Sequence, residues 1–262
     1  MLTLTLYLAT GIIAGILAGL LGVGGGIIIV PALLWSFNRL DIATDHAMQI
    51  AVGTSLATII VTSISSLLAH HKRGAILWET VRDLTPGILV GAAFGAMAAD
   101  YLPTDILQMI FAIFVLLVSL QMTLGKAPAA HRQLPGNTGM VIAGGGIGSL
   151  SAIVGIGGGS LTVPFLAFCN IKMQNAVATS SACGLPIAIA GSIGFVLMGL
   201  NESDLPNWSS GYIYWPAFIG ITITSAFFAP LGARLAHALP VAILKQVFGL
   251  LLSLMGLKML TS

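Results

Sequence analysis

Long stretches without a charged side chain alternate with short polar segments along the chain. A helix rises 1.5 Å per residue, so it needs about 20 apolar residues to cross the hydrocarbon core of a bilayer. Six stretches of 16 to 29 residues are free of Asp and Glu and contain no more than one Lys or Arg. They predict ordinary transmembrane helices: 46–71, 84–99, 106–125, 173–201, 205–233 and 235–257.

Two further uncharged stretches, 1–38 and 133–171, are too long for one crossing. As single helices each would measure roughly 57 Å, about twice the hydrocarbon core. Both contain a glycine cluster: residues 22–26 read Gly-Val-Gly-Gly-Gly and residues 155–159 read Gly-Ile-Gly-Gly-Gly. Each glycine costs about 1 kcal/mol in a helix interior. The clusters therefore predict unwound segments, and the prolines that follow, Pro31 and Pro164, suit the opening turn of a short helix.

The two halves of the chain repeat each other. The glycine clusters match at an offset of 133 positions. Met48-Gln49-x-Ala51-Val52-x-Thr54-Ser55 returns 125 positions later as Met173-Gln174-x-Ala176-Val177-x-Thr179-Ser180. A third match relates Gly95–Pro103 to Gly232–Pro240 at an offset of 137. We therefore expect two homologous transmembrane repeats, 1–125 and 138–262, joined by a polar cytoplasmic linker at 126–137.

The positions of Lys and Arg predict how the halves are oriented, because these residues concentrate on the cytoplasmic side of short loops. If each broken segment returns to the side where it began, eight of the ten cations share one side; if it crosses fully, only six do. Arg39 and Lys258 are the two on the opposite side. The expected fold is an all-α polytopic membrane protein of two inverted repeats. Each repeat has a glycine-broken re-entrant or half helix plus about three transmembrane helices.

Composition agrees with a protein that lies almost entirely in lipid. Of 262 residues, 57% are apolar and 7% charged, and the mean hydropathy is +1.02. A soluble surface needs about a quarter of the residues charged. The net charge of +2 argues against a nucleic-acid partner, and Cys169 and Cys183 lack metal-ligand spacing. We expect no metal, no cofactor and no cleaved signal peptide.

The glycine clusters are the main candidate for substrate binding. Unwound backbone leaves N–H groups without helical partners beside the positive end of the next helix, which favours an anion. A tight helix crossing that needs small residues is the alternative. Like Gly11, Gly15 and Gly19, the residues Gly87, Gly91 and Gly95 recur every fourth position and predict close helix packing. The candidate cradle comprises Gly22, Gly24, Gly25, Gly26, Ile27, Gly155, Gly157, Gly158, Gly159 and Ser160.

Polar side chains of the following helix are the second group of candidates. Amides and hydroxyls can donate to an oxyanion without placing a permanent charge in lipid, although hydrogen bonds between packed helices are an equal alternative. This group comprises Gln49, Thr54, Ser55, Gln174, Asn175, Thr179, Ser180 and Ser181. Three histidines, His46, His70 and His71, are candidates for a proton relay or a gate, or they simply mark helix ends at the interface.

The paired Gly-x-Gly-Gly-Gly-x-x-x-x-Pro segments, each followed by Met-Gln-x-Ala-Val-x-Thr-Ser, resemble the TauE/SafE family of membrane transporters over essentially the whole chain. The resemblance implies transport of a small sulfur-containing anion such as sulfite, sulfoacetate or another organosulfonate. Family members are usually discussed as exporters in the bacterial inner membrane.

The glycine-broken repeats and the family resemblance together predict a secondary transporter that exports such an anion by alternating access, with proton coupling left open. The chain has no G-x-x-x-x-G-K-[ST], G-x-S-x-G or H-E-x-x-H motif, so we do not expect an enzyme. An anion channel and a non-transporting membrane scaffold remain as alternatives. The expected partners are the lipid bilayer and the small anion, and a homodimer is left open.

Overall fold

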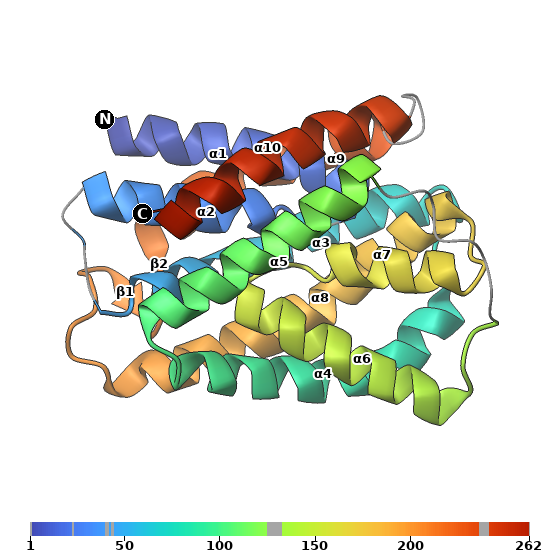
Figure 1. The fold of residues 1–262 in the computed structure, drawn as a ribbon, viewed down its shortest axis with the longest axis horizontal. Helices are drawn as coiled ribbons and strands as arrows, with labels where there is room; N and C mark the ends of the chain where they lie inside the picture. Colours follow the sequence, from blue (N-terminus) through green and yellow to red (C-terminus); the bar gives the residue numbers. More distant parts are fainter. Residues whose placement is uncertain are drawn as a thin grey trace.

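A computed structural model describes residues 2–22, 24–39, 42, 45–124, 133–235 and 241–261. The linker predicted at 126–137 lies outside these residues as far as position 132. The described chain forms ten α-helices and one short hairpin (Figure 1). The first half contains α1 (Leu2–Leu21), α2 (Gly26–Arg39), α3 (Ala47–His71), α4 (Trp78–Asp100) and α5 (Thr104–Leu124). The second contains α6 (Asn137–Val154), α7 (Gly159–Phe168), α8 (Met173–Met198), α9 (Trp215–Leu235) and α10 (Val241–Thr261). A 3₁₀ turn (Gly199–Asn201), β1 (Ser209–Ser210) and β2 (Ile213–Tyr214) join α8 to α9.

Each of the six stretches predicted as ordinary crossings contains a helix, but the helix predicted from 205 begins only at Trp215, after the hairpin. The division of the two glycine-broken segments also differs from the prediction. Six described helices have the length and hydropathy to cross a membrane, and they include α1 and α6 as well as α3, α5, α8 and α9. The break therefore follows a helix of nearly full length, and only α2 and α7 are short, with 14 and 10 residues. α4 has 23 residues, and its opening turns carry Glu79, Arg82 and Asp83.

The glycine clusters are unwound, as predicted. Gly22, Gly24 and Gly25 have φ values of 68°, 76° and 79°, and Gly155 and Gly158 have 72° and 78°. These left-handed conformations suit glycine because it has no Cβ.

The chain reverses at each cluster. α2 returns along α1, and the Tyr7 hydroxyl lies 2.9 Å from Ser36 Oγ. The predicted place of the prolines is wrong. Helices α2 and α7 begin at Gly26 and Gly159, so Pro31 and Pro164 are each the sixth residue of their helix rather than in the opening turn. Each helix begins directly after a left-handed glycine, Gly25 or Gly158, and therefore starts five residues before its proline.

Glycines at four-residue spacing bring two helix pairs into backbone contact, which confirms the predicted packing role. A methyl group built on Gly15 of α1 would lie 2.6 Å from the Ser225 carbonyl oxygen of α9, and one on Gly19 would lie 1.9 Å from that of Ala229. α4 and α6 pack in the same way, with Gly91 against the Gly145 carbonyl at 2.1 Å. In both pairs, residues further along one helix contact residues further along the other, so the two helices of each pair are parallel.

Helices at equivalent places in the two halves run antiparallel where they touch. At one end of the α3–α8 contact Ser66 Oγ donates to Ser181 Oγ, and at the other Gly191 packs against Leu56. α5 and α10 also run antiparallel: Gln108 Nε2 donates to the Met259 carbonyl, and Ser119 Oγ to that of Gly249.

Charged residues divide between the two ends of the bundle. The basic end, defined by the last turn of α3 and the first turns of α4 and α8, carries Lys72, Arg73, Arg82, Lys172 and Arg234, with Glu79 and Asp83. The acidic end carries Asp45, Asp100, Asp105, Glu202 and Asp204, with Arg39 and Lys258. Both termini lie at the acidic end (Figure 1). The predicted separation of Arg39 and Lys258 from the other cations therefore agrees with the helix directions.

Candidate functional site

The two glycine turns meet each other at the middle of α3. A methyl group built on Gly24 would lie 3.0 Å from Gly157 Cα and 3.1 Å from Ile59 Cγ2. One built on Gly26 would lie 2.1 Å from the Gly155 carbonyl oxygen. Gly24 and Gly157 occupy the same place in the sequence repeat. The turns thus touch backbone to backbone, and a side chain at Gly26 would separate them.

Two equivalent serines tie each glycine turn to the opposite half. Ser55 Oγ of α3 donates to the Gly155 carbonyl at 2.8 Å, and Ser180 Oγ of α8 donates to the Gly22 carbonyl at 3.1 Å. Both serine side chains are fully buried. In this conformation their hydroxyl hydrogens stabilise the junction between halves.

The neighbouring threonines make a second equivalent pair of contacts between the halves. Thr54 Oγ1 accepts from the backbone N–H of Tyr214, and Thr179 Oγ1 accepts from that of Leu77. Tyr214 and Leu77 are related by the offset of 137 that relates α4 to α9. Each threonine therefore holds the start of a helix in the other half and does so through an oxygen lone pair.

The remaining polar candidates lie nearer the helix ends. Asn175 Nδ2 donates to the Ala75 carbonyl. Ser181 Oγ donates to the Val177 carbonyl within α8 and receives the hydroxyl of Ser66. Gln174 is exposed to solvent at the basic end. Ser181 reaches the first glycine turn, because a methyl group built on Gly22 would lie 3.2 Å from its Oγ. Gln174 and Asn175 are not placed at the glycine turns by any contact of the described residues.

Several backbone amides at the turns have no backbone hydrogen-bond partner in the described part of the chain. At the start of α2 the amides of Ile28 and Ile29 donate to the Gly25 carbonyl, and at the start of α7 those of Leu161 and Thr162 donate to the Gly158 carbonyl. Within the described residues, no backbone carbonyl accepts from the amides before them, at 24–27 and 157–160. Because described Lys and Arg residues lie towards the helix ends, the donors here are neutral.

A stripe of buried hydroxyls runs along α3 from the glycine turns towards the basic end, and sequence reasoning missed most of it. The stripe consists of Ser55, Thr58, Thr62 and Ser66, followed by His70. These residues are three or four positions apart, which is the spacing of one helix face. This spacing was the sequence signal that could have revealed the stripe. A narrow cleft lined by Ala18, Gly22, Gly24, Thr62, Ser63, Ser66 and Ser181 follows the same direction. The cleft is too narrow in this conformation to admit a water-sized group.

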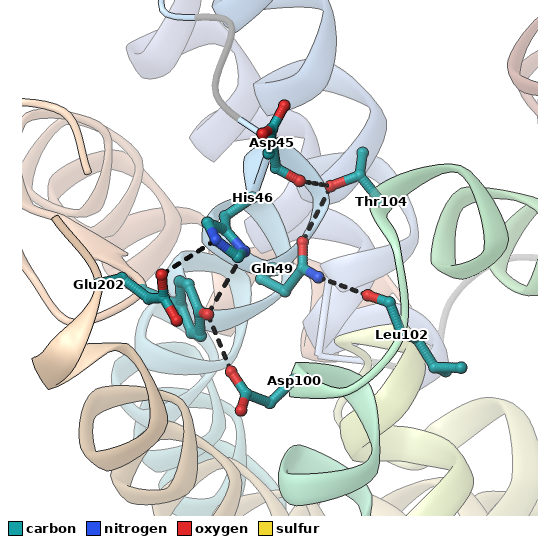
Figure 2. A network of polar contacts seen from close by, with 8 residues as sticks. Asp45, His46, Gln49, Asp100, Leu102, Thr104 and Glu202 are labelled. Atoms are coloured by element: carbon teal, nitrogen blue, oxygen red, sulfur yellow. Dashed lines mark hydrogen bonds and ion pairs between the residues drawn. The ribbon is translucent and has the colours of Figure 1, made fainter. Parts of the chain in front are cut away.

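A polar network closes the acidic end, and it includes one of the predicted histidines (Figure 2). His46 Nε2 lies 3.2 Å from Glu202 Oε2, and His46 Nδ1 lies 3.4 Å from the Tyr212 hydroxyl. Tyr212 donates to Asp100 Oδ1 at 2.8 Å. Burial, and then the hydrogen bond and charge of Asp100, raise the pKa of Tyr212 above its ordinary value. Tyr212 therefore remains a hydrogen-bond donor at neutral pH.

Gln49 extends this network to the turn between α4 and α5. Its Nε2 donates to the Leu102 carbonyl at 2.8 Å, and Thr104 Oγ1 lies 3.0 Å from its Oε1 (Figure 2). Thr104 also contacts the backbone carbonyl of Asp45. Gln49 therefore lies in the network at the acidic end and not at the glycine turns.

The other two histidines lie at the basic end. His70 is buried, with Nε2 3.3 Å from the Gly19 carbonyl oxygen. His71 is exposed and packs edge-on against Trp78. Among the described residues, no group of three His, Cys, Asp or Glu side chains is placed to hold a metal ion.

Comparison with known proteins shows the family of this chain. The family model described as "Sulfite exporter TauE/SafE" matches residues 7–259. The chain belongs to the TauE/SafE family. A "Probable membrane transporter protein" of Haemophilus influenzae is 39% identical over 256 residues, covering 97% of both chains. A relative from Bacillus subtilis, "Probable membrane transporter protein YunE", is 27% identical, covering 99% of this chain and 98% of its own. No solved structure matches the chain.

Proposed function

We propose that this multi-pass membrane transporter carries a small sulfur-containing anion, such as sulfite, sulfoacetate or another organosulfonate, out across the bacterial inner membrane. The observation that carries the proposal is the contact of the two unwound glycine turns at Gly24 and Gly157, with neutral amide donors on either side. The description of the matching family, a sulfite exporter, supports the choice of anion.

We infer that the halves are inverted repeats. Helices α3 and α8, and likewise α5 and α10, run antiparallel although they are equivalent. With the basic end in the cytoplasm, both termini are periplasmic and α2 and α7 return from mid-membrane to opposite sides.

We further propose alternating access between the two ends. The hydroxyl stripe and the narrow cleft lead from the glycine turns towards the basic end. The network of His46, Glu202, Tyr212 and Asp100 joins α3 and α4 to the loop before α9, so it closes the opposite end with contacts between halves. Opening that end requires breaking them. The contact of His46 Nε2 with Glu202 Oε2, at 3.2 Å, is the candidate place for proton coupling.

Efflux from proteoliposomes tests the proposal. Vesicles are loaded with sulfite, sulfoacetate or thiosulfate, with sulfate as a comparison, and efflux is followed with and without a pH gradient. Saturable efflux of one sulfur anion, lost in Gly26→Val, supports the proposal. The matched control is Gly146→Val, because a methyl group there meets no atom within 4 Å.

Two outcomes contradict transport by alternating access. Efflux that never saturates is the result expected of an anion channel. An absence of flux for every anion, from folded and inserted protein, is the result expected of a membrane scaffold.

A further inference from the structure

The second glycine turn is surrounded by buried hydroxyls that have no hydrogen-bond partner among the described residues. Ser151 Oγ, Ser160 Oγ and Thr162 Oγ1 are each buried without a donor or acceptor in reach, and the side chains of Ser151 and Thr162 are 1% and 0% exposed. A methyl group built on Gly158 would lie 3.4 Å from Thr162 Oγ1 and 3.6 Å from Ser151 Oγ, and 2.3 Å from Ile187 Cδ1, which packs against the same side of the turn. The last turn of α6 and the first turn of α7 thus bring two hydroxyls to one point of the turn.

The first glycine turn has no such group. The offset of 133 that aligns the glycines places Ala18, Ile27 and Ile29 where the second half has Ser151, Ser160 and Thr162. Gly25, the equivalent of Gly158, meets the Cβ and carbonyl of Ala14 instead. The two halves therefore differ at these three equivalent positions, which are apolar in the first half and, among the described residues, carry unpaired hydroxyls in the second.

An unpaired buried hydroxyl is unfavourable, because it loses its hydrogen bonds to water without gaining others. Most buried serines and threonines of this protein avoid that cost: Ser55, Thr58, Thr62 and Ser180 all donate to carbonyls. The hydroxyls at Gly158 have no hydrogen-bond partner among the described residues. They also lie beside the N-terminus of α7, where the helix dipole favours negative charge.

We propose that Ser151 and Thr162, with the N-terminal amides of α7, bind the oxyanion group of the substrate, so that the second half holds the charged head. The ligand class is a sulfite or sulfonate oxyanion recognised by neutral donors. This inference rests on the proposed function and names the residues that carry its specificity. Ser160 lies in the same turn of α7 and adds a third hydroxyl to the polar side.

Thermal unfolding and ligand binding of the purified protein test this assignment together. The variants are Thr162→Val and Ser151→Ala, and the matched control is Ile29→Val, which changes the equivalent position of the first half. The probes are sulfite, sulfoacetate and thiosulfate, added to the full chain in detergent. We expect the unliganded Tm of both variants to be unchanged or higher, because no hydrogen bond is lost. Affinity for the anion should fall about tenfold or more, as for a lost charge-assisted hydrogen bond, and Ile29→Val should keep it.

Two results would overturn the assignment. A lower unliganded Tm with unchanged affinity would show that the hydroxyls are structural. Equal losses of affinity in Thr162→Val and Ile29→Val would show that the site is symmetric. The proposed function fails separately, if the unaltered protein binds none of the three anions while remaining folded.

Discussion

Removing the hydroxyl of Ser55 should weaken the junction between halves. Ser55→Ala leaves the buried carbonyl of Gly155 without its donor, which lies 2.8 Å away in the structure. Water cannot replace it easily, because the backbone of Gly26 is packed against the same oxygen. An unsatisfied buried carbonyl costs about 1–3 kcal/mol. For a chain of this size that corresponds to a fall in Tm of about 2–12 °C.

The equivalent change in the other half should cost less. Ser180→Ala removes a longer hydrogen bond, 3.1 Å to the Gly22 carbonyl, and Gly22 lines the narrow cleft. We therefore expect the fall in Tm caused by Ser180→Ala to lie near the lower limit of this range, and the fall caused by Ser55→Ala to be larger.

A thiol-reactive fluorophore offers a direct readout of unfolding in detergent, since Cys169 and Cys183 are both buried. Ser192→Ala is the matched control on α8: its hydroxyl is buried but has no hydrogen-bond partner among the described residues. That variant should melt like the unaltered protein. If Ser55→Ala and Ser192→Ala melt at the same temperature, the bond between halves contributes nothing and the reasoning is refuted.

Three further predictions test other parts of the structure. Gly91→Ala should strongly reduce the yield of folded protein, because its Cβ would lie 2.1 Å from the Gly145 carbonyl oxygen. Gly146→Ala, the control, should be neutral or stabilise the protein by up to about 1 kcal/mol. The yield of folded protein, measured by gel filtration, distinguishes the two outcomes. Tyr212→Phe removes the donor to Asp100 and should lower stability by about 1–2 kcal/mol, measured as Tm; an unchanged Tm would contradict a closed acidic end. Lys72→Cys and Asp204→Cys should react with an impermeant thiol reagent from opposite sides of the membrane, and labelling from one side would refute the inverted arrangement.

Much of the fold followed from periodicity and repetition. The glycine clusters predicted the reversals at Gly24 and Gly157, and the spacing of Gly87, Gly91 and Gly95 predicted the contact of α4, although not its partner α6. Which helices pack together depends on contacts between distant segments, and a helix face alone does not reveal them.

The candidate site was predicted less completely. Ser55 and Ser180 were found because they recur in both halves, and their donation to the opposite turn fits the alternative of hydrogen bonds between helices. Tyr212, Asp100 and Glu202 were missed, because their grouping around His46 joins segments more than 100 positions apart and does not recur in the repeat. The asymmetry between Thr162 and Ile29 was readable from the aligned halves, but its meaning needed the burial of the hydroxyl.

Counterflow in proteoliposomes tests the central claim most directly. Vesicles loaded with an excess of unlabelled sulfite are diluted into a trace of labelled sulfite, and uptake of label is followed over time. A carrier that alternates between two ends exchanges internal for external anion, so the account predicts a transient accumulation of label above its equilibrium level. Label that rises only to equilibrium, at the rate of passive conduction, would contradict alternating access.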